Sequence, residues 1–216
     1  DPRTGEILES HIGWYHNIMS LLRNWYMIQT AAVDPAARAK KFDDNLMGEL
    51  IRFVSSHEVG HTLGLRHNMG ASSATPVEKL RDKDFQDKLG HTSSIMDYAR
   101  FNYVAQPEDG VKTFFPRIGD YDKWAIKWGY SYFDEAKSEK EEKAILNEMT
   151  KEAYKNRRLW FGTETSPYDP RYQTEDIGDN AMRASEYGIK NLKRILPNLM
   201  GWSAEKGESY AELEQL

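Results

Sequence analysis

The stretch HEVGHTLGLRHN, which runs from His57 to Asn68, decides which fold this sequence can adopt. Upstream of it, apolar residues between Leu46 and Val54 recur at helical spacing behind Asp43 or Asp44 as a capping residue. His57 and His61 extend the same stripe of this helix. Because side chains four residues apart lie one above the other on a helix, both imidazoles can reach one ion.

The second half of the stretch predicts how a third histidine joins the first two. Gly64 is expected to end the helix in a left-handed conformation, so that the chain turns sharply and carries His67 back toward the same ion. Glu58 sits one step round the helix, beside the metal. Three imidazoles with an open fourth position are typical of a catalytic zinc site, whereas closed structural sites normally recruit a fourth protein ligand.

A second stretch, HTSSIMDYARF from His91 to Phe101, gives this pattern a family. The motif HExxHxxGxxH followed by Ser94-Ile95-Met96-Asp97-Tyr98 resembles the metzincin clan of zinc peptidases. The resemblance implies that Met96 lies in a tight turn beneath the histidines as an apolar floor and does not bind the zinc. It also implies that Tyr98 approaches the metal and stabilises the transition state.

The same resemblance implies a reaction. One Zn²⁺ held by His57, His61 and His67 would activate a water molecule, and Glu58 would act as the general base in peptide-bond hydrolysis. The expected substrate is a peptide or protein cut internally. Asn68 departs from the diagnostic residues that other subfamilies carry after the third histidine.

A narrower resemblance rests on DPRTGEIL, SIMDYARFNY and EYGIKNLKRI. These stretches resemble the zincin domain of large bacterial zinc-dependent metalloproteases of the cell envelope. It implies an extracytoplasmic location, whether periplasmic, outer-envelope or secreted, and the remainder of a larger polypeptide as a partner. Residues 1–8 are expected to form a turn and a short strand of an incomplete hairpin.

Composition and charge exclude several kinds of site and partner. The chain has 216 residues, a formal net charge of −5 and no cysteine, which excludes disulfides and cysteine-type zinc sites. It has no basic block that would track a phosphate backbone, so nucleic acid is not an expected partner. No apolar run reaches the roughly 18 residues that a membrane span needs.

The expected fold is predominantly α, a zincin-like α+β catalytic domain that lacks most of its N-terminal sheet. We predict this catalytic domain over residues 1–130 and a helical extension over residues 131–216. Helices are expected over residues 12–33, from Asp120, from Ser138 to Arg157 and over residues 181–196, with loops over residues 64–119 and 162–179.

Two other functions remain open at this stage: a catalytically idle zinc-binding interaction module, and hydrolysis of a non-peptide amide by the same residues. The weaker site candidates are His91, which could line the cleft, and the helical histidines His11 and His16. Asp169, Glu175, Asp176 and Asp179 could supply oxygens for calcium, although their spacing matches no known calcium loop.

Overall fold

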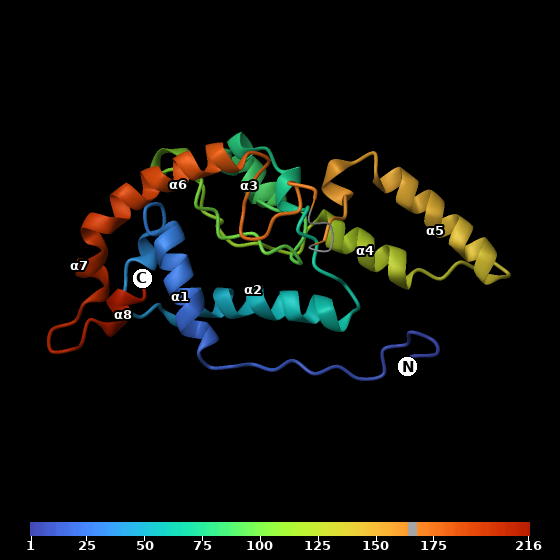
Figure 1. Cartoon of the computed structure of the whole chain (residues 1–216), viewed down its shortest axis with the longest axis horizontal. Helices are drawn as coiled ribbons and strands as arrows, with labels where there is room; N and C mark the ends of the chain where they lie inside the picture. Colours follow the sequence, from blue (N-terminus) through green and yellow to red (C-terminus); the bar gives the residue numbers. More distant parts are fainter. Residues whose placement is uncertain (164–167) are drawn as a thin grey trace.

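The computed structural model describes residues 1–163 and 168–216, and its regular elements are helices (Figure 1). The α-helices are α1 (Ile18–Thr30), α2 (Asp44–Thr62), α3 (Lys83–Leu89), α4 (Asp120–Tyr130), α5 (Glu139–Ala153), α6 (Ala181–Ile195), α7 (Leu199–Ser203) and α8 (Ala211–Glu214). The described part of the chain contains no β-strand, so the predominantly α class is confirmed. Within it, no helix has both the length and the apolar character that crossing a membrane requires.

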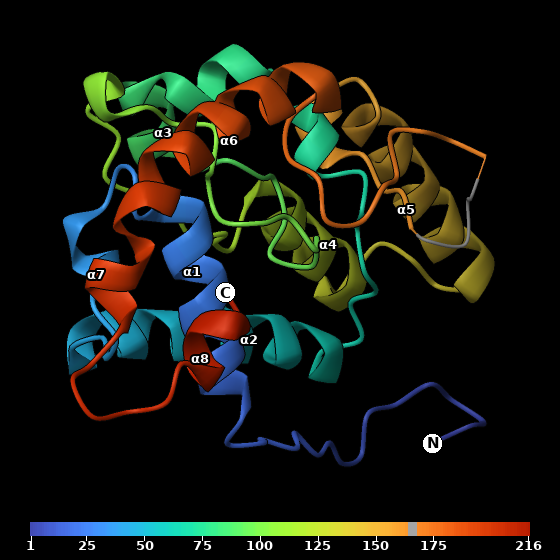
Figure 2. The ribbon, with the colours of Figure 1, turned by 60° about the vertical axis from the view of Figure 1, so that its left-hand side comes forward.

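The main core forms where α1 packs against α2 and α6, and Figure 2 shows α1 standing between these two helices. Tyr26 of α1 is 1% exposed and its ring contacts the rings of Phe42, Phe101 and Phe115. Its hydroxyl donates to Asp34 at 2.6 Å, which satisfies the one polar atom of the side chain. Burying a large apolar side chain contributes roughly 1.5–3 kcal/mol, and Phe101 also contacts Phe53 of α2, so this aromatic cluster joins α1 to α2.

A second, smaller core holds α6 against the loops that surround the predicted site. Its buried members are Val77, Leu80, Val104, Ile177, Ala184 and Tyr187. Tyr187 and Ala184 come from α6, and the others come from 3-10 turns and irregular segments. Helix α6 therefore packs against segments near residues 77–80, 104 and 177, which are far apart in the sequence. The predicted division at residue 130 stays a prediction.

The predictions for the first seventeen residues are wrong in part. The turn forms, with the Gly5 N–H donating to the Asp1 carbonyl at 2.8 Å. Residues 6–14 then run alongside α2 without strand pairing, because no described residue offers them a hydrogen-bonding edge (Figure 1). Helix α1 begins at Ile18 rather than at residue 12. Residues 11–17 are exposed, and a helical turn without packing is marginal in water.

The predicted loop over residues 64–119 contains one helix that the sequence analysis missed. Asp82 caps α3 by accepting the Phe85 N–H at 3.0 Å, but seven residues are too few to display a helical period. Helix α4 also begins differently, because Asp120 does not cap it: the carboxylate of Asp122 accepts the Gly119 N–H at 2.7 Å. Ser138 caps α5 as predicted, although this helix ends at Ala153. Part of the predicted loop over residues 162–179 lies outside the described residues.

Candidate metal centre

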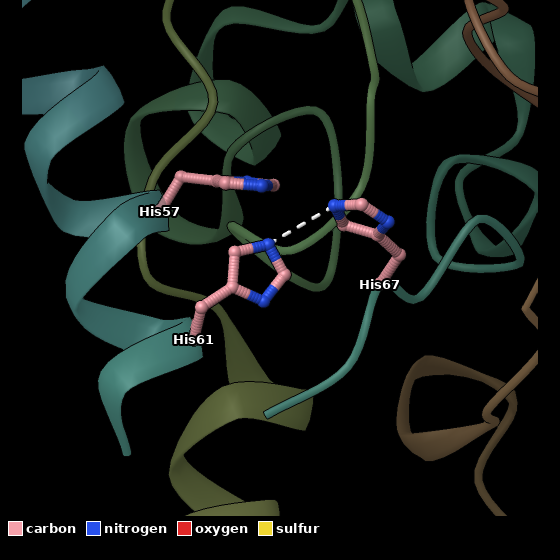
Figure 3. A group of neighbouring side chains, drawn as sticks. All are labelled: His57, His61 and His67. Carbon is pink, nitrogen blue, oxygen red and sulfur yellow. Dashed lines mark hydrogen bonds between the residues drawn. The ribbon is translucent and has the colours of Figure 1, made fainter. Parts of the chain in front are cut away.

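The C-terminal end of α2 brings three histidines together as the spacing predicts (Figure 3). Gly64 has a φ of 86°, in the left-handed region, and the Leu65 N–H donates back to the Gly60 carbonyl at 3.0 Å. This is the hydrogen bond that closes a glycine-terminated helix. The chain then reverses direction, and His67 faces His57 and His61 from the opposite side.

Main-chain carbonyls orient two of the three rings. The Nδ1 atom of His57 lies 2.8 Å from the Ile95 carbonyl, and that of His61 lies 2.9 Å from the Leu65 carbonyl. A carbonyl only accepts, so each Nδ1 carries the proton and each Nε2 offers a lone pair. Burial lowers the pKa of His57, which favours the neutral ring that a metal needs.

The donor set fits zinc. Ligand atoms of the three histidines all lie within 4.8 Å of one another, and the Nε2 atoms of His61 and His67 are 3.0 Å apart. Two nitrogens on a tetrahedral zinc with bonds of about 2.05 Å stand about 3.4 Å apart, so the His61 and His67 nitrogens lie close to the spacing that zinc needs. In the described part of the chain, this is the one group of histidines and acids that could hold a metal.

Met96 lies under the helix that carries the first two histidines. It is fully buried at 0% exposure, and its Sδ would stand 2.3 Å from a Cβ placed on Gly60. A side chain at position 60 would therefore displace the end of the Met96 side chain. The Asn68 N–H donates to the Met96 carbonyl at 3.0 Å, so the chain that follows His67 is joined to the same turn.

Asp122 of α4 holds the methionine turn in place, a role that the sequence analysis missed. One carboxylate oxygen accepts the Ser94 hydroxyl at 2.6 Å, and the other accepts the Ile95 N–H at 2.7 Å. Asp122 is 3% exposed, and burial raises the pKa of its carboxyl. Since Ile95 also supplies the carbonyl that orients His57, α4 reaches the metal cluster through this turn. The only available signal was the GDYD sequence at the start of α4.

Tyr98 and Glu58 both lie at the cluster. The ring of Tyr98 is 41% exposed, and its centroid stands 4.4 Å from that of His67 and 5.5 Å from that of His57. Glu58 lines the same cavity as His57 and Tyr98. A carboxylate and a phenol thus share a cavity with one of the histidines.

Asn68, which follows the third histidine, ties it to the C-terminal half of the chain. Its side-chain oxygen accepts the Gly162 N–H at 2.9 Å, and its amide donates to the Trp160 carbonyl at 2.9 Å. Asn68 is 0% exposed. Both polar atoms of the amide are satisfied by backbone more than ninety residues away in the sequence. The residue that departs from other subfamilies therefore has a structural partner of its own.

The weaker candidates do not join the site. His91 is 1% exposed and its Nε2 donates to the Arg100 carbonyl at 3.0 Å, so it supports the wall of the cavity from inside the core. His11 and His16 are exposed. The four acids proposed for calcium are dispersed among separate partners, which are Arg171 for Asp169, Arg100 for Glu175, Ser72 for Asp176 and the Val77 N–H for Asp179.

Comparison with known proteins gives one match. A family model described as Met-zincin matches residues 39–216, from just before α2 to the last residue. This span contains the three histidines, Met96 and Asp122. No curated protein and no solved structure matches the chain.

Proposed function

This chain belongs to the Met-zincin family, and from that premise we propose that it is a zinc-dependent peptidase that cuts peptide or protein substrates internally. The observation that carries the proposal is the cluster of His57, His61 and His67, with Glu58 and Tyr98 beside it. Three imidazoles leave a fourth position for water or substrate, as catalytic zinc sites do. An extracytoplasmic location is proposed on the sequence resemblance alone.

The residues divide the reaction between them. His57, His61 and His67 would hold a zinc ion, which would lower the pKa of a bound water toward neutrality and polarise a carbonyl group. Glu58 takes the proton from the attacking water and passes it to the leaving amine. The Tyr98 hydroxyl donates a hydrogen bond to the oxygen on which negative charge develops. Ile95 and Leu65 keep the rings of His57 and His61 in the binding tautomer throughout.

The test separates proton transfer from metal binding. Wild-type protein and Glu58→Gln are loaded with zinc, and cleavage of an unfolded protein and of a fluorogenic peptide library is followed. We expect Glu58→Gln to keep its zinc and to lose about 10²–10⁴-fold in kcat/KM, the usual range for a general base. Glu49→Gln is the matched control, because Glu49 lies on the same helix but is exposed beside Arg52.

Three results would overturn the proposal. If Glu58→Gln retained wild-type turnover, the base would be misassigned. If the zinc-loaded wild type cut no peptide, the chain would instead be an idle zinc-binding module. If it cut only small non-peptide amides, the same residues would serve a different substrate class.

A further inference from the structure

A cavity of about 170 Å³ opens beside the metal cluster. Helix α1 supplies one wall through Ile18, Leu22 and Trp25, and α2 supplies another through Val54 and Glu58. The third wall is the segment from Asp97 to Phe101, directly after Met96. Most of these side chains are apolar, so the cavity suits an apolar group that reaches in from the metal centre.

Arg100 is a charged residue in this wall, and two neighbours hold its side chain. Its guanidinium carbon lies 3.8 Å from the centroid of the Trp25 ring, a stacked cation–π contact. Glu175 forms an ion pair with the same guanidinium, and the Glu175 N–H donates to the Tyr98 carbonyl at 3.2 Å. The main chain at Arg100 is fixed as well. The Arg100 carbonyl accepts a hydrogen bond from His91, and the Phe101 N–H donates one to the Gln29 side chain.

A second cavity, of about 380 Å³, also has Arg100 in its wall. It is lined by Ile28 and Gln29, one turn further along α1 than Trp25, and by Ile189 and Leu192 of α6. The α1 residues of the two cavities lie on one continuous stripe. Arg100 therefore borders both cavities.

We propose that Arg100, held by Trp25 and Glu175, closes the inner end of the substrate side-chain cavity and so limits the length of the apolar side chain that can bind beside the metal. This rests on the proposed peptidase function. The closed cavity holds one apolar side chain of about leucine or phenylalanine size. Removal of the Arg100 side chain joins the two cavities and admits longer side chains, whose added methylenes become buried against α1 and α6.

Glu175 makes this length limit depend on the C-terminal half of the chain. It has a φ of 71°, a conformation in which side chains other than glycine, asparagine and aspartate are uncommon. Its side chain is 48% exposed, so its removal does not open the core. Glu175→Gly suits the left-handed backbone and removes the side chain whose carboxylate holds Arg100.

The test uses hydroxamates, which bind a zinc ion without turnover, with unbranched alkyl chains of increasing length. Dissociation constants are measured on zinc-loaded wild type, Arg100→Ala, Glu175→Gly and the exposed-surface control Arg52→Ala. In wild type, each buried methylene should tighten binding about fourfold until the chain reaches Arg100, after which the gain stops. In Arg100→Ala the gain should continue over further methylenes, and Glu175→Gly should shift the limit in the same direction by less.

The outcomes are distinguishable. The same length limit in wild type, Arg100→Ala and Glu175→Gly, with equal affinity for the shortest hydroxamate, would overturn the role of Arg100. If the length limit moved as expected but no peptide were cleaved, the peptidase proposal alone would fail. If the shortest hydroxamate did not bind wild type at all, the metal centre would be absent, and the role of Arg100 would fall with it.

Discussion

Gly60→Ala tests the contact between α2 and the methionine turn. Gly60 lies on α2 between His57 and His61, and a Cβ there would stand 2.3 Å from the Met96 Sδ and 3.3 Å from its Cε. Ordinary van der Waals contacts lie at 3.4–4 Å, so Met96 would have to move by about 1 Å. Met96 is 0% exposed, so its side chain can move only within the protein interior.

Gly48 provides the matched control, because it lies on the same helix with nothing within 4 Å of its added Cβ. Gly48→Ala should stabilise the protein by up to about 1 kcal/mol through helix propensity. Gly60→Ala gains the same propensity but overpacks a core, which typically costs about 1–3 kcal/mol net. The two variants should therefore differ by about 2–4 kcal/mol, or roughly 4–16 °C in Tm for a chain of this length.

The assay is thermal unfolding of both variants, of Met96→Ala and of Gly60→Ala/Met96→Ala, each with and without zinc. Met96→Ala alone should cost about 2–5 kcal/mol because it leaves a cavity. In the double variant the new methyl group fills part of that cavity, so the combined loss should be smaller than the sum by at least about 1 kcal/mol. If Gly60→Ala stabilises the protein as Gly48→Ala does, or if the two losses simply add, Met96 does not pack under the helix as described.

Three further predictions concern the supports of the site. Asp122→Ala should lower the free energy of unfolding in urea by about 2–5 kcal/mol and weaken zinc binding, because it leaves the Ser94 hydroxyl and the N–H groups of Ile95 and Gly119 without their acceptor. Unchanged zinc affinity would show that Asp122 does not support His57 through the methionine turn. Asn68→Ala should lower the free energy of unfolding by about 1–3 kcal/mol. It should weaken zinc binding more than Asn156→Ala does, because the Asn156 side chain caps only a local 3-10 turn. Equal zinc affinities in the two variants would contradict this. Burial raises the pKa of Asp176 from 3.8 to about 6, so the native state holds its proton more tightly and stability falls as pH rises through about 6. The Tm of metal-free Asp176→Asn should accordingly rise relative to wild type between pH 4 and pH 7, and parallel Tm profiles would show that Asp176 is not responsible.

The arrangement of the three histidines was predictable from the sequence. Helical spacing places His57 above His61, and a glycine three residues later is a sufficient signal for the turn that returns His67, because both depend only on backbone geometry. The place of Met96 followed from its motif. The packing partner that makes Gly60 necessary did not, since it depends on how two distant segments cross.

The long-range supports could not be predicted in the same way. The sequence signals an acid near the start of α4, and a capping role for Asp120 was the natural interpretation, yet Asp122 makes the contacts. The pairing of Asn68 with residues 160–162 and of Arg100 with Glu175 joins segments that no periodicity relates. The strand predicted within residues 1–8 illustrates the opposite failure, because a strand needs a partner as well as a composition.

The most direct test of the central claim is X-ray absorption spectroscopy at the zinc edge on the zinc-loaded chain. The structure predicts one zinc per chain with three imidazole nitrogens and one further oxygen ligand from solvent, and loss of one imidazole in His67→Ala. A closed shell of four protein ligands, or a spectrum that His67→Ala leaves unchanged, would contradict the account of a catalytic metal centre.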